Sequence, residues 1–156
     1  MIRKYAFLAL AALFLTTPCA AARSDLTLAM VLEPPHLDPT AGAAAAIDEI
    51  VYANIFEGLT RIGPKGEVQP ALAANWDISP DGKTYIFHLR EGAKFHDDAA
   101  FDANDVKFSL DRARAPDSTN AQKGLFAAID KVEVIDPATV KITLKQPSGD
   151  FLYNMG

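Results

Sequence analysis

The stretch 71–106 reads ALAANWDISPDGKTYIFHLREGAKFHDDAAFDANDV, and its pattern decides the fold class. Two predicted strands, 75–78 and 84–90, are separated by the sequence SPDG at 79–82. Proline presets the first turn angle and glycine tolerates positive φ, so this stretch predicts a β-hairpin. Apolar side chains alternate along the second strand with the period of two expected of a strand with unlike faces. The alternating set is Tyr85, Phe87 and Leu89.

Two more hairpins flank this one in the sequence. Residues 59–62 reach 67–68 through the turn GPKG, and residues 132–134 reach 140–145 through a turn at Asp136-Pro137. Both turns contain the residue types that favour chain reversal. Three hairpins, with one helix between the second and third and another before the first, predict a hairpin-rich mixed α+β unit. This order argues against the alternating strands and helices of a doubly wound sheet.

A helix is predicted between the second and third hairpins. Asp102 is placed to cap its start, and Asp105 supplies the negative charge that suits a first turn. The helix ends near Ala115, because Pro116 cannot continue it. Its apolar stripe is Val106, Leu110 and Ala113.

Two elements are predicted before the first hairpin. Residues 26–32 form a short apolar strand candidate, which the prolines at 34, 35 and 39 prevent from continuing. After the small residues at 41–46, apolar side chains recur at helical spacing from Ile47 onward. Gly58 is placed just beyond the end of this helix, where glycine is favoured.

The first 22 residues have the order of a cleaved secretory signal peptide. Arg3 and Lys4 precede an apolar run at 5–15, and the run leads through TTP to Ala20-Ala21-Ala22. The run is too short to span a bilayer core, which needs about 20 helical residues. Charged, apolar and small residues in this order predict cleavage after Ala22.

The expected mature chain, residues 23–156, is acidic and free of cysteine. Cys19 is the only cysteine, and the TTP before it matches the Leu-x-small-Cys box of lipoproteins poorly, so we expect no lipid anchor. Loss of the two charges Arg3 and Lys4 moves the formal net charge from −5 to −7. This charge disfavours binding to nucleic acids or to anionic membranes.

Several motifs occur in a defined order between residues 26 and 156. They are LDP at 37–39, FEGL at 56–59, LAxxW at 72–76, DGxTYxFxLR at 81–90, GxKFHD at 92–97, DVxFS at 105–109 and DPxTVxIxL at 136–144. This order resembles the signature of the family 5 extracellular solute-binding proteins, receptors that serve ABC importers for peptides, nickel complexes and some sugars. The resemblance implies a two-lobed periplasmic-binding-protein fold of class II type that closes on its solute. Family members are much longer, so 23–156 is expected to be a truncated N-terminal part with an exposed apolar edge at 26–32.

The resemblance also implies where a solute is bound and what the receptor works with. In relatives, the loop between the LDP turn and the first helix approaches the ligand partly through backbone groups. We therefore expect the backbone of Ala43, Ala44, Ala45 and Ala46 to line the cleft. The expected partners are a peptide or small-molecule solute and an ABC transporter permease in the inner membrane, with the receptor acting as a periplasmic monomer without a cofactor.

Catalysis is the main alternative. His96, Asp97 and Asp98, with His36 and Asp38 as distant partners, have side chains that can bind zinc or transfer protons. No HExxH, paired-cysteine, GxSxG, GxxxxGK[ST] or GxGxxG motif accompanies them in the sequence. A receptor is therefore the leading hypothesis, and a secreted metal-dependent enzyme or a non-functional remnant of the receptor are the alternatives.

Six aromatic residues between 76 and 108 raise the question of a ligand-stacking surface. Their spacing along predicted strands makes a core role the expectation. They are Trp76, Tyr85, Phe87, Phe95, Phe101 and Phe108.

Overall fold

The computed structural model describes residues 25–156 except 43 and 53, so the predicted signal peptide and Cys19 lie outside the described residues. The described residues fall into two units, 25–31 and 32–156. None of the helices described is long and apolar enough to cross a membrane.

The predicted strand at 26–32 is wrong. Residues 25–30 have no regular secondary structure, and residues 31–32 form a bend. A strand needs a neighbour to pair its backbone N–H and C=O groups, and none of the strands in the described ranges pairs with this segment. The expected exposed apolar side chains are observed at Leu26, Leu28 and Val31.

A four-stranded antiparallel sheet with the order β3-β4-β6-β5 forms the centre of the second unit. Its strands are β3 (Ala73–Ile78), β4 (Thr84–Leu89), β5 (Ile129–Asp136) and β6 (Thr139–Leu144). The second and third predicted hairpins are confirmed as β3–β4 and β5–β6, and the two hairpins join where Phe87 of β4 pairs with Val140 of β6. Gly82 in the β3–β4 turn has a φ of 69°. Glycine adopts this left-handed conformation without steric cost, which explains why the turn has a glycine at this position.

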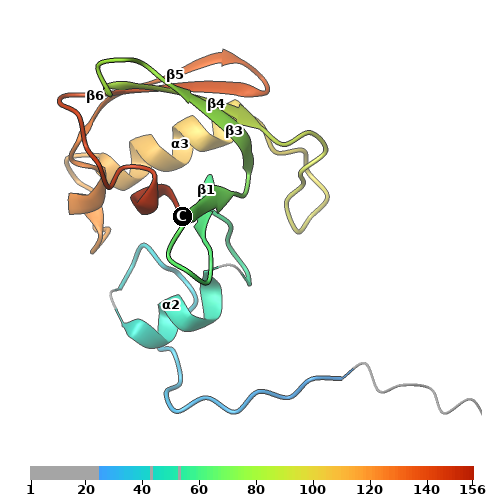
Figure 1. Cartoon of the computed structure of the whole chain (residues 1–156). Helices are drawn as coiled ribbons and strands as arrows, with labels where there is room; N and C mark the ends of the chain where they lie inside the picture. The colour runs from blue at the N-terminus through green and yellow to red at the C-terminus, as the bar shows by residue number, and fades with distance from the viewer. Residues whose placement is uncertain (1–24, 43, 53) are drawn as a thin grey trace, which may run out of the picture. The chain divides into compact units, whose positions relative to one another are not determined.

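Helix α3 (Ala103–Arg114) lies against one face of this sheet and contacts β5 and β6 (Figure 1). Its predicted start is confirmed. The Asp102 side chain accepts a 2.7 Å hydrogen bond from the Asn104 backbone, and the Asp105 side chain accepts a 2.9 Å bond from the Asp102 backbone. This reciprocal capping box satisfies N–H groups that the first helical turn leaves free. Val106 and Leu110 of the predicted stripe are buried against the sheet.

The core lies between the sheet and α3 and includes residues near the C-terminus. Tyr85 and Phe87 of β4 are buried, and the ring centroid of Tyr85 lies 4.6 Å from that of Phe151. The core role expected of the aromatic residues is wrong at two positions: Phe95 is 47% exposed and Phe108 is 66% exposed. Phe108 departs from the pattern because it lies on the α3 face that points away from the sheet.

A second, smaller sheet consists of the first predicted hairpin. Its strands are β1 (Thr60–Ile62) and β2 (Val68–Pro70), and Gly66 in the connecting turn has a φ of 80°. The C-terminal residues 153–155 form a short 3-10 helix, η4 (Tyr153–Met155), beside β1. The buried hydroxyl of Thr60 donates a 2.6 Å hydrogen bond to the Leu152 carbonyl and joins these two parts of the chain.

Helix α2 (Ala45–Val51) is shorter than predicted, because it ends before Tyr52 and not near Gly58. The Tyr52 backbone is extended, and the N–H groups of Ile55 and Phe56 both donate to the Val51 carbonyl. Beyond Val51, the Tyr52 hydroxyl bonds to Gln122 and the Ile55 carbonyl bonds to His96, and both partners lie in distant loops. Tertiary contacts therefore override the helical periodicity of this segment.

Candidate functional site

A large open hollow, with a volume of about 1480 Å³, lies within the second unit. Its walls come from segments 36–40, 54–59, 94–96, 117–120 and 153–156 and from side chains of α3. These segments are far apart in the sequence, and only the tertiary fold brings them together. The lining combines apolar and charged side chains, as ligand-binding sites commonly do.

Two hydrogen bonds position the wall that follows α2. The Tyr52 hydroxyl donates to Gln122 Oε1 at 3.2 Å, which ties the end of α2 to the loop before η3 (Lys123–Phe126). The His96 Nε2 donates to the Ile55 carbonyl at 3.0 Å and ties the loop after β4 to the same wall. Burial raises the pKa of Tyr52, and the charge of Asp48 raises it further, so the hydroxyl stays protonated and able to donate.

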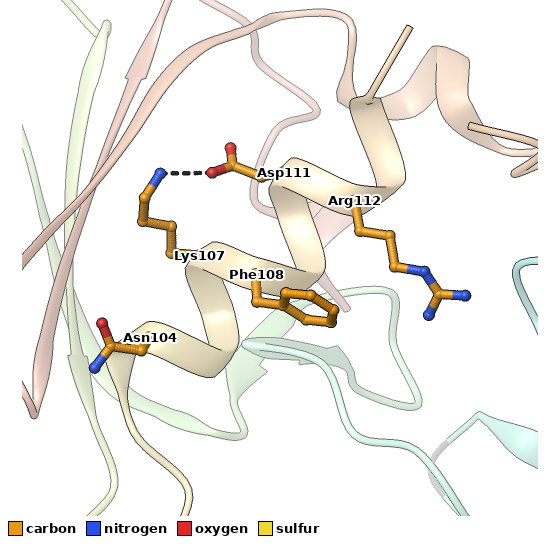
Figure 2. Close-up of a pocket in the computed structure, with 5 residues that line it drawn as sticks. All are labelled: Asn104, Lys107, Phe108, Asp111 and Arg112. Atoms are coloured by element: carbon orange, nitrogen blue, oxygen red, sulfur yellow. Dashed lines mark hydrogen bonds and ion pairs between the residues drawn. The ribbon is translucent and has the colours of Figure 1, made fainter. Parts of the chain in front are cut away.

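The outer face of α3 forms another wall of the hollow and also carries a shallow depression. Figure 2 shows Lys107 and Asp111 joined on one side of the helix, while Phe108 and Arg112 project away from that pair. Phe108 and Arg112 also line the hollow. They are separated by four residues, which places them on one helical face.

Asp38, at the turn before α2, is one of the acids that line the hollow. Its Oδ1 accepts from the Thr40 backbone at 2.8 Å and from the Thr40 hydroxyl at 2.7 Å. These two bonds, that of the hydroxyl foremost, lower the pKa of Asp38, and the charge of Arg112 contributes to the same shift. The carboxylate is therefore ionised at neutral pH and held in one orientation.

The residues expected to line the cleft through their backbone lie around the start of α2. Ala43 lies outside the described residues, Ala44 and Ala45 are exposed, and Ala46 is buried. Their contact with a solute stays a prediction.

The acid and imidazole side chains considered for catalysis are used in loop structure. Asp97 Oδ1 accepts from the Ala99 backbone at 3.0 Å, and Asp98 lies 3.6 Å from Lys94. In the part of the chain that the structure describes, no three His, Cys, Asp or Glu side chains gather in a way that could hold a metal ion. The enzyme alternative thus gains no support from this geometry.

Sequence reasoning missed the polar wall that includes Tyr52, Gln122 and Arg112. Residues 117–123 read as an ordinary polar loop, and Arg112 reads as one of several helix cations. The one available signal was the aromatic and cationic pair Phe108 and Arg112, spaced by four residues on the helix face opposite the predicted apolar stripe. Which loops face that pair depends on long-range packing.

Comparison with known proteins gives one consistent result. The sequence profile of the bacterial extracellular solute-binding proteins, family 5 Middle, matches residues 67–156. The glutathione-binding protein GsiB of Salmonella paratyphi A is 41% identical over 147 residues, which are 92% of this chain and 28% of that protein. The chain therefore spans less than a third of the length of this relative.

Solved structures agree with the sequence comparison. NikZ from Campylobacter jejuni in complex with Ni(L-His) matches with a TM-score of 0.71 and 35% identity, over 80% of this chain and 24% of that one. DppA from Helicobacter pylori in complex with the peptide STSA matches with a TM-score of 0.64 and 31% identity, over 77% of this chain and 27% of that one. The expected mixed α+β fold is confirmed, and the described residues cover only part of the fold of these proteins. This chain belongs to family 5 of the bacterial extracellular solute-binding proteins.

Proposed function

We propose that this chain is part of an extracytoplasmic receptor that binds a peptide-like or other small polar solute and delivers it to an ABC importer. The observation that carries the proposal is the hollow of about 1480 Å³. One of its walls is polar, and the chain that forms it belongs to this family. Three relatives support the solute class: one is named for glutathione, one holds Ni(L-His) and one holds the peptide STSA. All three solutes are built from amino acids.

The proposed mechanism contains no covalent step. A receptor of this kind needs only a closed state that binds the solute more tightly than the open state does. Solute binding then shifts the population of lobe positions, and the permease recognises the closed form. The signal peptide predicted at 1–22 supports delivery of the receptor to the periplasm.

Solute binding by the full chain tests the proposal. Glutathione, Ni(L-His) and the peptide STSA are titrated into the protein by isothermal calorimetry. We expect saturable binding of at least one of them, because the hollow is formed by residues of this chain.

A matched pair of variants locates the binding site. Gln122→Ala removes a side chain that lines the hollow, whereas Gln146→Ala removes an exposed glutamine from the turn after β6. We expect the first variant to weaken solute binding and the second to leave it unchanged. Failure of all three solutes to bind, or equal binding by both variants and the parent chain, contradicts the proposed site.

A further inference from the structure

A short hairpin between β4 and α3, residues 93–101, forms one wall of the hollow. The Phe95 N–H donates to the Ala99 carbonyl at 2.9 Å, and the Asp98 N–H donates to the Phe95 carbonyl at 3.0 Å. Asp98 has a φ of 68°, the left-handed conformation that closes a three-residue hairpin loop. These features hold the tip of the 93–101 hairpin together as a rigid unit.

The base of the 93–101 hairpin is fixed, whereas its tip is exposed. At the base, the Phe101 N–H donates to the Ala93 carbonyl at 3.1 Å, and the ring centroids of Phe95 and Phe101 lie 6.0 Å apart. Residues 94–100 are all exposed, so little buried area holds the tip in place. Segments with few buried contacts open at a low cost in free energy.

His96 connects this tip to the rest of the unit. Its Nε2 donates to the Ile55 carbonyl at 3.0 Å, between residues that are 41 positions apart in the sequence. Among the residues that the structure describes, no other hydrogen bond or ion pair joins 94–100 to a residue outside the hairpin. The neighbouring acids Asp97 and Asp98 bond within the hairpin instead. The position of the tip therefore depends on His96.

The hydrogen bond from His96 joins two walls of the hollow. His96 lies on the hairpin wall with Lys94 and Phe95, and Ile55 lies in the opposite wall at 54–57. The bond therefore fixes the separation of these two walls. Its acceptor is a backbone carbonyl, which every residue type at position 55 would supply, so the side chain at position 96 alone decides whether the bond forms.

We propose that the 93–101 hairpin is a gate of the hollow and that His96 is the positioning residue that holds the gate closed. Because the gate belongs to the same hollow, this inference rests on the proposed receptor function. When the bond breaks, the hairpin turns about its base and separates from the wall at 54–57, which admits a solute. When the bond forms again, the site regains its shape. A site whose walls are already fixed binds more tightly, because less conformational freedom is lost on binding.

Two substitutions of similar length isolate the hydrogen bond. His96→Gln keeps an N–H donor near the end of the side chain, whereas His96→Met has no donor. Position 96 is exposed, so both variants should fold. His88→Met is the matched control, because His88 does not line the hollow and pairs with Asp77 on the sheet.

Solute binding gives the first measurement. Glutathione and the peptide STSA are titrated into the full chain and the three variants by isothermal calorimetry. His96→Met is expected to weaken binding about three- to tenfold, as the loss of one hydrogen bond does. His96→Gln should restore most of the parent affinity, and His88→Met should bind as the parent chain does. Surface plasmon resonance should show faster dissociation from His96→Met, because a gate without its hydrogen bond opens more readily.

The Phe56 amide reports the hydrogen bond in the absence of solute. Its nitrogen belongs to the same peptide group as the Ile55 carbonyl, so loss of the bond at that carbonyl shifts the amide resonance. In proton–nitrogen correlation NMR spectra, His96→Met should move this resonance. His96→Gln should return it toward the parent position, and His88→Met should leave it unchanged.

Other outcomes separate the gate from the receptor function. Equal weakening of solute binding by His96→Gln and His96→Met, or parent-like binding by His96→Met, overturns the gate and keeps the receptor function. An unmoved Phe56 resonance in His96→Met also overturns the gate. If neither solute binds the parent chain, the receptor proposal fails, whereas a Phe56 shift in His96→Met that is absent from His96→Gln still supports His96 as the positioning residue of the hairpin.

Discussion

Gly58 packs directly against the carbonyl oxygen of Met155, so that the start of β1 and the C-terminal turn touch through their backbones. A Cβ at residue 58 would collide with that oxygen and would lie 2.8 Å from the Thr60 carbonyl. Backbone atoms cannot move aside as a flexible side chain can. We expect Gly58→Ala to lower the free energy of unfolding by about 1–3 kcal/mol, the usual cost of overpacking, measured by urea denaturation.

Gly124 provides the control for this substitution. A Cβ there meets nothing within 4 Å, so Gly124→Ala should leave the urea midpoint nearly unchanged. Equal midpoints for the two variants would show that the C-terminal turn does not pack on β1 in solution.

The capping box of α3 should contribute measurably to stability. Asp102→Ala removes the acceptor for the Asn104 backbone N–H and is expected to lower the free energy of unfolding by about 1 kcal/mol. Asp102→Asn keeps an oxygen at the same position and should cost far less. Thermal unfolding, monitored by circular dichroism, distinguishes the two variants. An equal loss of stability in both would show that the charge of Asp102, and not its capping oxygen, causes the effect.

Two phenylalanines allow the stability contribution of the core to be compared with that of the outer face of α3. Phe87 is 0% exposed and Phe108 is 66% exposed. Phe87→Ala should cost about 3–5 kcal/mol through lost burial and a residual cavity, whereas Phe108→Ala should stay within about 0.5 kcal/mol. Urea unfolding of both variants checks this, and a large loss at Phe108 would mean that its helix face is covered in solution.

The Asp111 ion pairs predict a loss of stability in acid. Burial acts to raise the pKa of Asp111, but hydrogen bonds from Lys107 and Arg114 outweigh it and lower the pKa below its ordinary value of 3.8. Because the folded-state pKa is the lower one, these pairs contribute fully above pH 4 or so, and the contribution is lost as the pH falls through the folded-state pKa.

Asp111→Asn measures this contribution. The side chain is 37% exposed, so solvent screening limits the expected difference from the parent chain to about 1 kcal/mol at pH 7. The difference should disappear once the pH has fallen below the folded-state pKa of Asp111. Asp130→Asn is the control, since its exposed side chain makes none of the ion pairs found in residues 25–156. A pH-independent difference at Asp111 would contradict the electrostatic origin.

Export and cleavage can be tested in a bacterial host. The periplasmic product is expected to begin at Arg23, because the small residues at 20–22 suit the positions before a signal peptidase cut. Mass spectrometry of the osmotic-shock fraction measures this. Cys19→Ala should not change the distribution between shock fraction and membrane, and membrane retention that depends on Cys19 would instead indicate a lipid anchor.

Local sequence patterns predicted most of the secondary structure of residues 59–145. The three hairpins and the capped helix were confirmed, since turn residues and a capping acid act over a few neighbours. The strand at 26–32 and the helix end at Gly58 were wrong for the opposite reason. A strand needs a partner, and the segment after Val51 is held by Gln122 and His96, which lie far along the chain.

The candidate site was much less accessible from the sequence. The predicted residues Ala43 to Ala46 were chosen through resemblance to a family and not through their own chemistry, and their role stays a prediction. Arg112 and Asp38 lie in separate segments, and no local signal shows that both line one hollow. The exposure of Arg112 follows from which side of α3 meets the sheet.

The sequence by itself determined the family, the α+β class and the exact turns of the three hairpins, because motif order, alternation and turn chemistry are local properties of the chain. Only the tertiary structure decided that β4 pairs with β6, that Gly58 lies against Met155, and that Phe108 and Arg112 face a hollow and not the core. These relationships join residues that are distant in sequence. They depend on the close packing of the whole unit, because the position of each side chain is limited by the space that its neighbours leave.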